Sequence, residues 1–175
     1  MTTQLINSLA VEIDGNGEAL LCIHGLGGSS NTWTPLLAAL SDFRVIRPDL
    51  PGSARSPLLA VPLSIEGYAA SLEALLAELG VESVHVMAHS LGTVVAQHLA
   101  VRNPGKIKSL ALFGPLVAPP EAARSNIVAR AAAARGGASA MQEIANAIVQ
   151  GATSQETKAE QPAVLALVRE SVMRQ

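Results

Sequence analysis

The stretch VHVMAHSLGTVVAQHLA, residues 84–100, holds a single serine, Ser90, between two apolar runs. The run before it, 83–88, is short, β-branched and apolar, which is typical of a strand buried on both faces. The run after it, 91–102, places apolar residues at helical spacing and ends before Asn103-Pro104-Gly105. Ser90 is therefore predicted to lie on a sharp turn from strand to helix.

Such a turn strains the backbone at the serine and leaves room only for small residues two positions before and after it. Those residues are Ala88 and Gly92. The pattern matches the G-x-S-x-G nucleophile elbow with alanine in the first glycine position, a geometry that exposes the serine hydroxyl at the carboxyl end of a sheet. The helix that follows directs its positive end to the same place. Taken alone, the stretch also fits a serine that caps an ordinary helix.

The bulk composition excludes several classes of protein. The 175 residues suffice for one domain with a core, and a net charge of −2 without a basic cluster argues against a nucleic-acid surface. The amino terminus lacks the features of a signal peptide, and no run is long enough to span a bilayer. The single cysteine, Cys22, lies in an apolar run and offers neither a disulfide nor a metal cluster, so we expect a cytoplasmic protein without a metal.

Strand and helix patterns alternate through most of the first 114 residues. Strands are expected at 8–13, 19–23, 43–47, 83–88 and 107–113, and helices at 31–40, 65–79 and 91–102. Asp14-Gly15-Asn16-Gly17, after the first strand, has hairpin chemistry. The alternation predicts an α/β fold, a mostly parallel sheet with helices on both faces.

From residue 118 onward only helical patterns remain. Pro119-Pro120 breaks the alternation, and helix-like segments are expected at 122–135, 138–149 and 163–173. We therefore expect a sheet core over 1–117 and a helical cap over 118–175. The cap should cover the carboxyl ends of the strands and roof a cavity that the Ser90 hydroxyl faces.

Three motifs, in the same order and at plausible spacing, resemble the amino-terminal part of the α/β-hydrolase superfamily. His24-Gly25-Leu26-Gly27-Gly28 resembles the histidine-glycine loop that follows an early strand. Residues 49–56, DLPGSARS, resemble the D-x-x-G-x-G-x-S loop, with Ala54 in place of the second glycine, which puts the local shape of that loop in question. The elbow at Ser90 is the third motif.

The resemblance implies that Ser90 is a nucleophile and that the backbone N–H groups of Leu26 and Leu91 form an oxyanion hole. Further candidates for the substrate pocket are His24, Gly25, His89 and Trp33.

Structural roles are expected for several histidines, for Asp49 and for Trp33. His24 is expected to shape its loop, and Asp49 is implied to anchor the loop that it begins rather than to act as the triad acid. His85 and His98 are expected to pack or to satisfy local hydrogen bonds. Trp33 is expected to be a core residue or a pocket wall.

The triad is incomplete in this sequence. In this fold the chain order is serine, then carboxylate, then histidine, and no histidine follows His98. A serine hydroxyl without a base is a poor nucleophile. We therefore expect a truncated hydrolase that is inactive by itself, with a naturally short relative of different function as the alternative. Truncation would leave the strand at 107–113 with an uncovered edge, which favours self-association.

The function that the resemblance implies is hydrolysis of a small-molecule ester or lactone through an acyl-enzyme, without a metal or organic cofactor. Residues 130–149 loosely resemble the lids of 3-oxoadipate enol-lactonases and related esterases, which would let Arg130 or Arg135 meet a substrate carboxylate. Glu121 is a weak candidate for the triad acid. Two alternatives stay open: a non-catalytic binding scaffold, and a C–C bond hydrolase or cofactor-free haloperoxidase-like relative.

Overall fold

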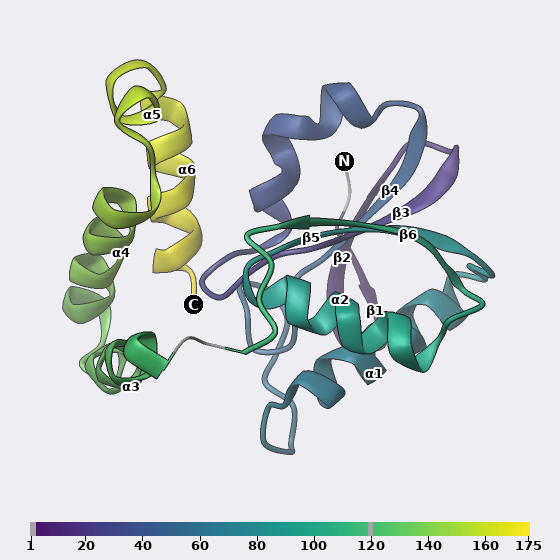
Figure 1. Ribbon diagram of the computed structural model, residues 1–175, viewed down its shortest axis with the longest axis horizontal. Coiled ribbons are helices and arrows are strands. Elements are labelled where there is room, and N and C mark those ends of the chain that lie inside the picture. The colour runs from purple at the N-terminus through teal and green to yellow at the C-terminus, as the bar shows by residue number, and fades with distance from the viewer. Residues whose placement is uncertain (1–2, 119–120) are drawn as a thin grey trace. The chain divides into compact units, whose positions relative to one another are not determined.

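A six-stranded mixed sheet organises the first part of the chain (Figure 1). The computed structural model describes residues 3–118 and 121–175. The strands are β1 (Thr3–Ile6), β2 (Leu9–Asp14), β3 (Glu18–Ile23), β4 (Phe43–Pro48), β5 (Val84–His89) and β6 (Ile107–Phe113), in the order β1-β2-β4-β3-β5-β6. The last four are mutually parallel, and β1 and β2 are antiparallel additions at one edge. The predicted fold class is confirmed.

Helices cover both faces of this sheet. On one face, α1 (Ile65–Glu78) and α2 (Leu91–Arg102) bury their apolar sides against β3, β5 and their neighbours in a large core. On the other face, η1 (Ser30–Leu40) places Trp33 in a smaller cluster with Leu20, Cys22 and Val45. Both clusters lie against the parallel strands, and two of these, β3 and β4, are buried on both faces over their last four residues.

The chain divides into two compact units, Met1–Val117 and Ala118–Gln175. The second unit contains α3 (Glu121–Ala134), α4 (Ala138–Ala152), α5 (Gln155–Glu160) and α6 (Pro162–Met173). Within it α4 packs against α6, and Ala145 and Val172 are buried. The short helix α5 was not expected, and the expected break at Pro119-Pro120 lies outside the described residues. The role of this unit as a cap stays a prediction.

In the ranges 3–118 and 121–175, no helix combines the length and the apolar character that crossing a membrane requires.

The sequence predicts a β-hairpin turn at residues 14–17, but in the structure the hairpin turn lies at residues 7–8. The turn at Gly15 and Gly17 connects β2 to β3, but β4 lies between these strands in the sheet. Glycine is needed at 17 because a Cβ there would lie 1.8 Å from the carbonyl oxygen of Asp42. The true hairpin joins β1 and β2 through Asn7 and Ser8, whose φ angles of 47° and 67° fit a type I′ turn.

The segment predicted as a helix at 31–40 is a 3₁₀ helix, η1. Pro35 lies inside it, lacks an N–H and would clash with the carbonyl one α-turn earlier, which disfavours α geometry. In this helix Trp33 is buried, whereas Leu36 is 39% exposed.

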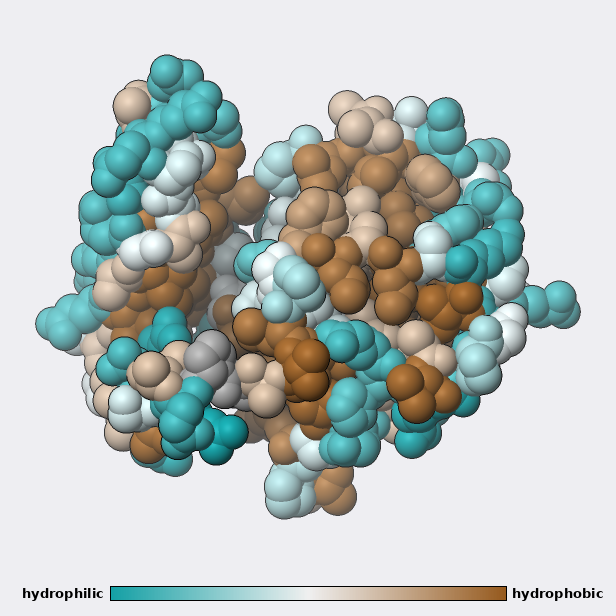
Figure 2. All heavy atoms as spheres, viewed as in Figure 1, coloured by the Kyte–Doolittle hydropathy of each residue, from teal (hydrophilic) through white to brown (hydrophobic). Residues whose placement is uncertain are grey.

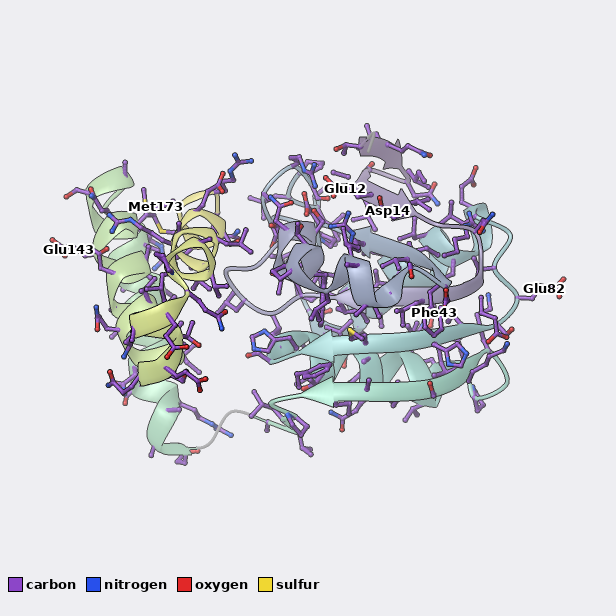
Figure 3. All side chains as sticks on the ribbon, turned by 90° about the horizontal axis from the view of Figure 1, so that it is seen from above. Glu12, Asp14, Phe43, Glu82, Glu143 and Met173 are labelled. Carbon is purple, nitrogen blue, oxygen red and sulfur yellow. The ribbon has the colours of Figure 1, made fainter. Side chains whose placement is uncertain are left out.

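A buried ion cluster that the sequence analysis missed joins β2 and β4. The Arg47 side chain is 0% exposed, and its Nη2 lies 2.9 Å from Glu12 and 2.7 Å from Asp14. Its Nη1 donates to the carbonyl oxygen of Ser30 at 3.2 Å. Glu12 and Asp14 lie near each other on β2 (Figure 3). The cluster ties the antiparallel edge to η1.

Replacing Arg47 with methionine should destabilise the fold by about 3–5 kcal/mol, because it leaves carboxylates partly buried without their cation. The midpoint of urea unfolding measures this loss. Arg44→Met is the matched control, since half-buried Arg44 lies on the same strand and forms no ion pair with any residue in the described ranges. Equal midpoints for the two variants would show that the cluster does not stabilise the fold.

Candidate active site

Ser90 has the strained backbone that the elbow predicts. Its φ of 52° and ψ of −119° lie outside the strand and helix regions. Its N–H donates to the carbonyl oxygen of Phe113 at 2.9 Å, and its own carbonyl oxygen accepts from the Thr93 hydroxyl at 2.6 Å. Contacts with β6 and α2 therefore hold the turn in this conformation.

Small residues on both sides of Ser90 let α2 approach the sheet. Ala88 is fully buried in β5. At Gly92 a Cβ would lie 2.4 Å from the carbonyl oxygen of Ile23 and 2.6 Å from that of His24. These oxygens belong to the backbone, so a side chain at this position cannot be accommodated by a rotamer change. Glycine at 92 thus fixes the start of α2 against the end of β3.

The loop after β3 lies directly beside Ser90. A Cβ built on Gly25 would lie 2.9 Å from the Ser90 Cβ and 3.1 Å from the Nδ1 of His89. Leu26 follows at the surface, 69% exposed. Among the described residues, the backbone N–H groups of Leu26 and Leu91 donate no hydrogen bond. Unpaired N–H groups at a loop and at a helix start are suited to bind an anion.

His24 is a buried link between two loops. Its Nδ1 lies 2.8 Å from the Gly25 carbonyl oxygen, and the Leu50 N–H donates to its Nε2 at 2.9 Å. These partners assign the proton to Nδ1, and both ring nitrogens are engaged. Burial lowers the pKa of His24 and keeps the ring neutral. This geometry fits the expected loop-shaping role.

The lowered pKa of His24 predicts a loss of stability in mild acid. The unfolded chain binds a proton near the ordinary pKa of 6.5, whereas the folded state resists protonation, so stability falls as the pH drops below that value. The urea midpoint should therefore decrease between about pH 7 and pH 5.5. The decrease should be smaller in His24→Gln, whose amide can donate to Gly25 and accept from Leu50. Equal slopes in the two proteins would contradict the assignment.

Asp49 anchors the loop that follows β4. Its carboxylate accepts from the Ser30 N–H at 2.7 Å and from the Arg55 Nε at 2.8 Å. Burial opposes the charged form, but these hydrogen bonds outweigh it, and the pKa of Asp49 is lowered. Ala54, which replaces the second glycine of the motif, keeps a positive φ of 47°. The loop thus adopts a glycine-like conformation at Ala54 despite its Cβ.

The other two pocket candidates, Trp33 and His89, differ in their exposure to solvent. Trp33 is 3% exposed and belongs to the core cluster under η1. Its ring meets that of Phe113 edge-on, with centroids 6.2 Å apart. His89 is exposed at the end of β5. Trp33 is thus mainly a core residue, whereas His89 can reach solvent beside the serine.

None of the four histidines is bonded to the Ser90 hydroxyl. His85 contacts Ser109 at 2.8 Å and Glu18 at 3.3 Å, and His98 lies 3.7 Å from Glu66. Within 3–118 and 121–175, no hydrogen bond joins the Ser90 hydroxyl to a histidine or a carboxylate. The described residues supply a serine and two free N–H groups, but no bonded base.

Comparisons with known proteins identify similar chains by sequence and by structure. A family model described as alpha/beta hydrolase fold matches residues 18–156. The lipase LipV of Mycobacterium tuberculosis is 38% identical over 99 residues, which are 57% of this chain and 38% of that lipase. The chain spans less than two thirds of the length of the curated relatives it matches.

Two solved structures are similar over nearly the whole chain. A thermophilic esterase from Thermogutta terrifontis, solved with malate bound, gives a TM-score of 0.86 at 25% identity, covering 99% of this chain and 67% of that one. The enol-lactonase of Burkholderia xenovorans gives a TM-score of 0.83 at 26% identity, covering 98% and 67%.

Proposed function

Because the chain belongs to the α/β-hydrolase fold family, we propose that it carries the nucleophile of a serine hydrolase acting on carboxylic esters or lactones. The observation that supports this most directly is Ser90 itself. A serine held at φ 52° between a buried strand and a helix, beside Gly25, is costly to the fold and is the geometry of an exposed nucleophile.

The proposed reaction forms and then breaks an acyl-enzyme. The Ser90 Oγ attacks the carbonyl carbon, and the oxygen of that carbonyl becomes an oxyanion. The N–H groups of Leu26 and Leu91 donate to this oxyanion, and the positive end of α2 favours the same charge. The bond to the alcohol oxygen then breaks, the alcohol takes up a proton, and water releases the acid.

This reaction needs a base that accepts the Ser90 proton. No histidine of the described chain is bonded to that hydroxyl, so we infer that the histidine and its carboxylate are supplied by residues outside this chain. The greater length of the solved relatives supports this inference, since the chain covers 67% of the esterase and of the enol-lactonase. Residues 118–175 would then form the lid, with Arg130 or Arg135 able to meet a substrate carboxylate.

A fluorophosphonate tests the proposed nucleophile without requiring turnover. An oxyanion hole alone retains part of the catalytic effect, so slow labelling at mildly alkaline pH should modify Ser90 ahead of the other serines. Intact mass and peptide mapping identify the site, and Ser90→Ala should abolish the main adduct. Labelling spread over several serines would support the scaffold alternative.

A matched pair of variants tests the oxyanion role of Leu26, whose side chain is largely exposed. Leu26→Pro removes the backbone N–H, whereas Leu26→Ala keeps it. The proline variant should label about 100-fold more slowly than the alanine variant, because one oxyanion donor is lost. Equal rates would remove Leu26 from the proposed mechanism.

A further inference from the structure

The chain turns where it leaves β6, and the turn brings it beside the start of α2 (Figure 1). Gly114 has a φ of 61°, a left-handed conformation that glycine adopts without steric cost. Pro115 follows and has no backbone N–H. Hydrophobic atoms predominate on the surface at this point (Figure 2), and Leu116 is half-buried. Backbone groups in such surroundings are stabilised by partners within the protein.

Two side chains of α2 bind the backbone of Leu116. Its N–H donates to the Thr93 hydroxyl at 3.1 Å, and its carbonyl oxygen accepts from the Gln97 side-chain amide at 2.7 Å. The same amide donates to the carbonyl oxygen of Thr93 at 3.0 Å. Both partners of the amide are carbonyl oxygens, so its nitrogen rather than its oxygen faces them. The two backbone groups of Leu116 are thus both bound by α2.

The Thr93 hydroxyl connects this segment to the turn that holds Ser90. It accepts from the Leu116 N–H and donates to the carbonyl oxygen of Ser90 at 2.6 Å. Thr93 is 0% exposed, so bulk water does not compete for either partner. The N–H of Ser90 donates to the Phe113 carbonyl oxygen. The backbone of Ser90 is therefore held on both sides by groups that lead to residues 113–116.

The strained backbone of Ser90 requires such support. A residue in a sparsely populated region of backbone space persists only where surrounding contacts fix it, and Ser90 at φ 52° is such a residue. Resting on the proposed function, in which the Ser90 hydroxyl attacks the substrate, we propose that Thr93 and Gln97 are positioning residues. They fasten residues 113–116 to the turn and thereby fix the direction of the Ser90 hydroxyl.

Two substitutions at Thr93 separate the hydroxyl from the shape of the side chain. Thr93→Val keeps the shape and loses the hydroxyl, whereas Thr93→Ser keeps the hydroxyl. The Thr93 N–H, which also donates to Ser90, is present in both variants. With a fluorophosphonate, Thr93→Val should be modified at Ser90 about tenfold more slowly than the parent, because displacing a reacting group slightly costs at least that much in rate. Thr93→Ser should label at close to the parent's rate.

Gln97→Met tests the second contact and supplies the comparison should Thr93→Val fail to fold. It removes the amide that binds Leu116 and should also slow labelling of Ser90. Val101→Met is its matched control, since Val101 is on the same helix, is 82% exposed and lies away from this contact. Equal labelling rates for these two variants would remove Gln97 from the proposal.

Two further measurements separate positioning from a merely structural role. The Leu116 amide proton should exchange faster in Thr93→Val than in the parent or Thr93→Ser, whatever the chemistry at Ser90. In the same digests, labelling of the other serines should not rise, as it would if the fold had loosened generally.

Unchanged labelling of Ser90 in Thr93→Val would overturn the positioning role, as would unchanged exchange at Leu116 or a Thr93→Ser protein slowed as much as Thr93→Val. A parent whose Ser90 is not labelled ahead of its other serines would instead contradict the proposed function, and the positioning role with it.

Discussion

Purified by itself, the chain is expected to hydrolyse 4-nitrophenyl acetate over multiple turnovers no faster than its Ser90→Ala variant. The described residues bring no bonded base to the Ser90 hydroxyl. Removing such a base from a serine hydrolase costs on the order of a millionfold in turnover. Initial rates with the ester in large excess over protein measure this directly.

The outcome that would contradict this expectation is turnover in the parent that disappears in Ser90→Ala. It would mean that a histidine of this chain acts as the base. His89→Gln and His98→Gln would then identify it, because both side chains are accessible to solvent, whereas His24 has both ring nitrogens engaged. A single slow acylation without release would agree with the proposed function.

Gly92→Ala is expected to destabilise the fold by more than about 4 kcal/mol, enough to leave much of the chain unfolded. The new Cβ would overlap two backbone carbonyl oxygens, those of Ile23 and His24. Relief requires α2 to move away from β3, which would disrupt the core cluster that both elements share. Far-UV circular dichroism and urea unfolding measure the loss.

Gly105→Ala is the matched control for this substitution. A Cβ on Gly105 would meet nothing within 4 Å, and its φ is not in the left-handed region. Its midpoint should stay within about 0.5 kcal/mol of the parent's. A Gly92→Ala protein as stable as this control would mean that α2 is free to shift, and the close approach would lose its structural role.

The strands and helices of the parallel core could be predicted because their signals are local. The run at 107–113 and the helix at 91–102 were located within a residue of β6 and α2. The edge strand β1 was missed because Thr3 and Gln4 have little apolar pattern, and the strand exists through its pairing with β2. The hairpin at Gly15 was misplaced because strand order depends on contacts distant in sequence.

Part of the candidate site could be predicted because its signals are also local in the sequence. Ser90, Gly92 and His24 belong to short motifs whose spacing carries their geometry. The ion cluster was not found, because Arg47 and Asp14 are 33 residues apart and meet only in the folded sheet. A signal was present all the same: a charged residue such as Arg47 inside a strand that is otherwise apolar must find a partner.

The strained backbone of Ser90 affects which residues evolution favours at this position. At φ 52° a side chain of any kind is strained, and glycine would relieve on the order of 1 kcal/mol. Selection for stability alone would therefore favour glycine at this position over serine. A serine maintained against that pressure is expected in a lineage that has used the hydroxyl for chemistry, and a lineage that had become a binding scaffold would be expected to drift away from it.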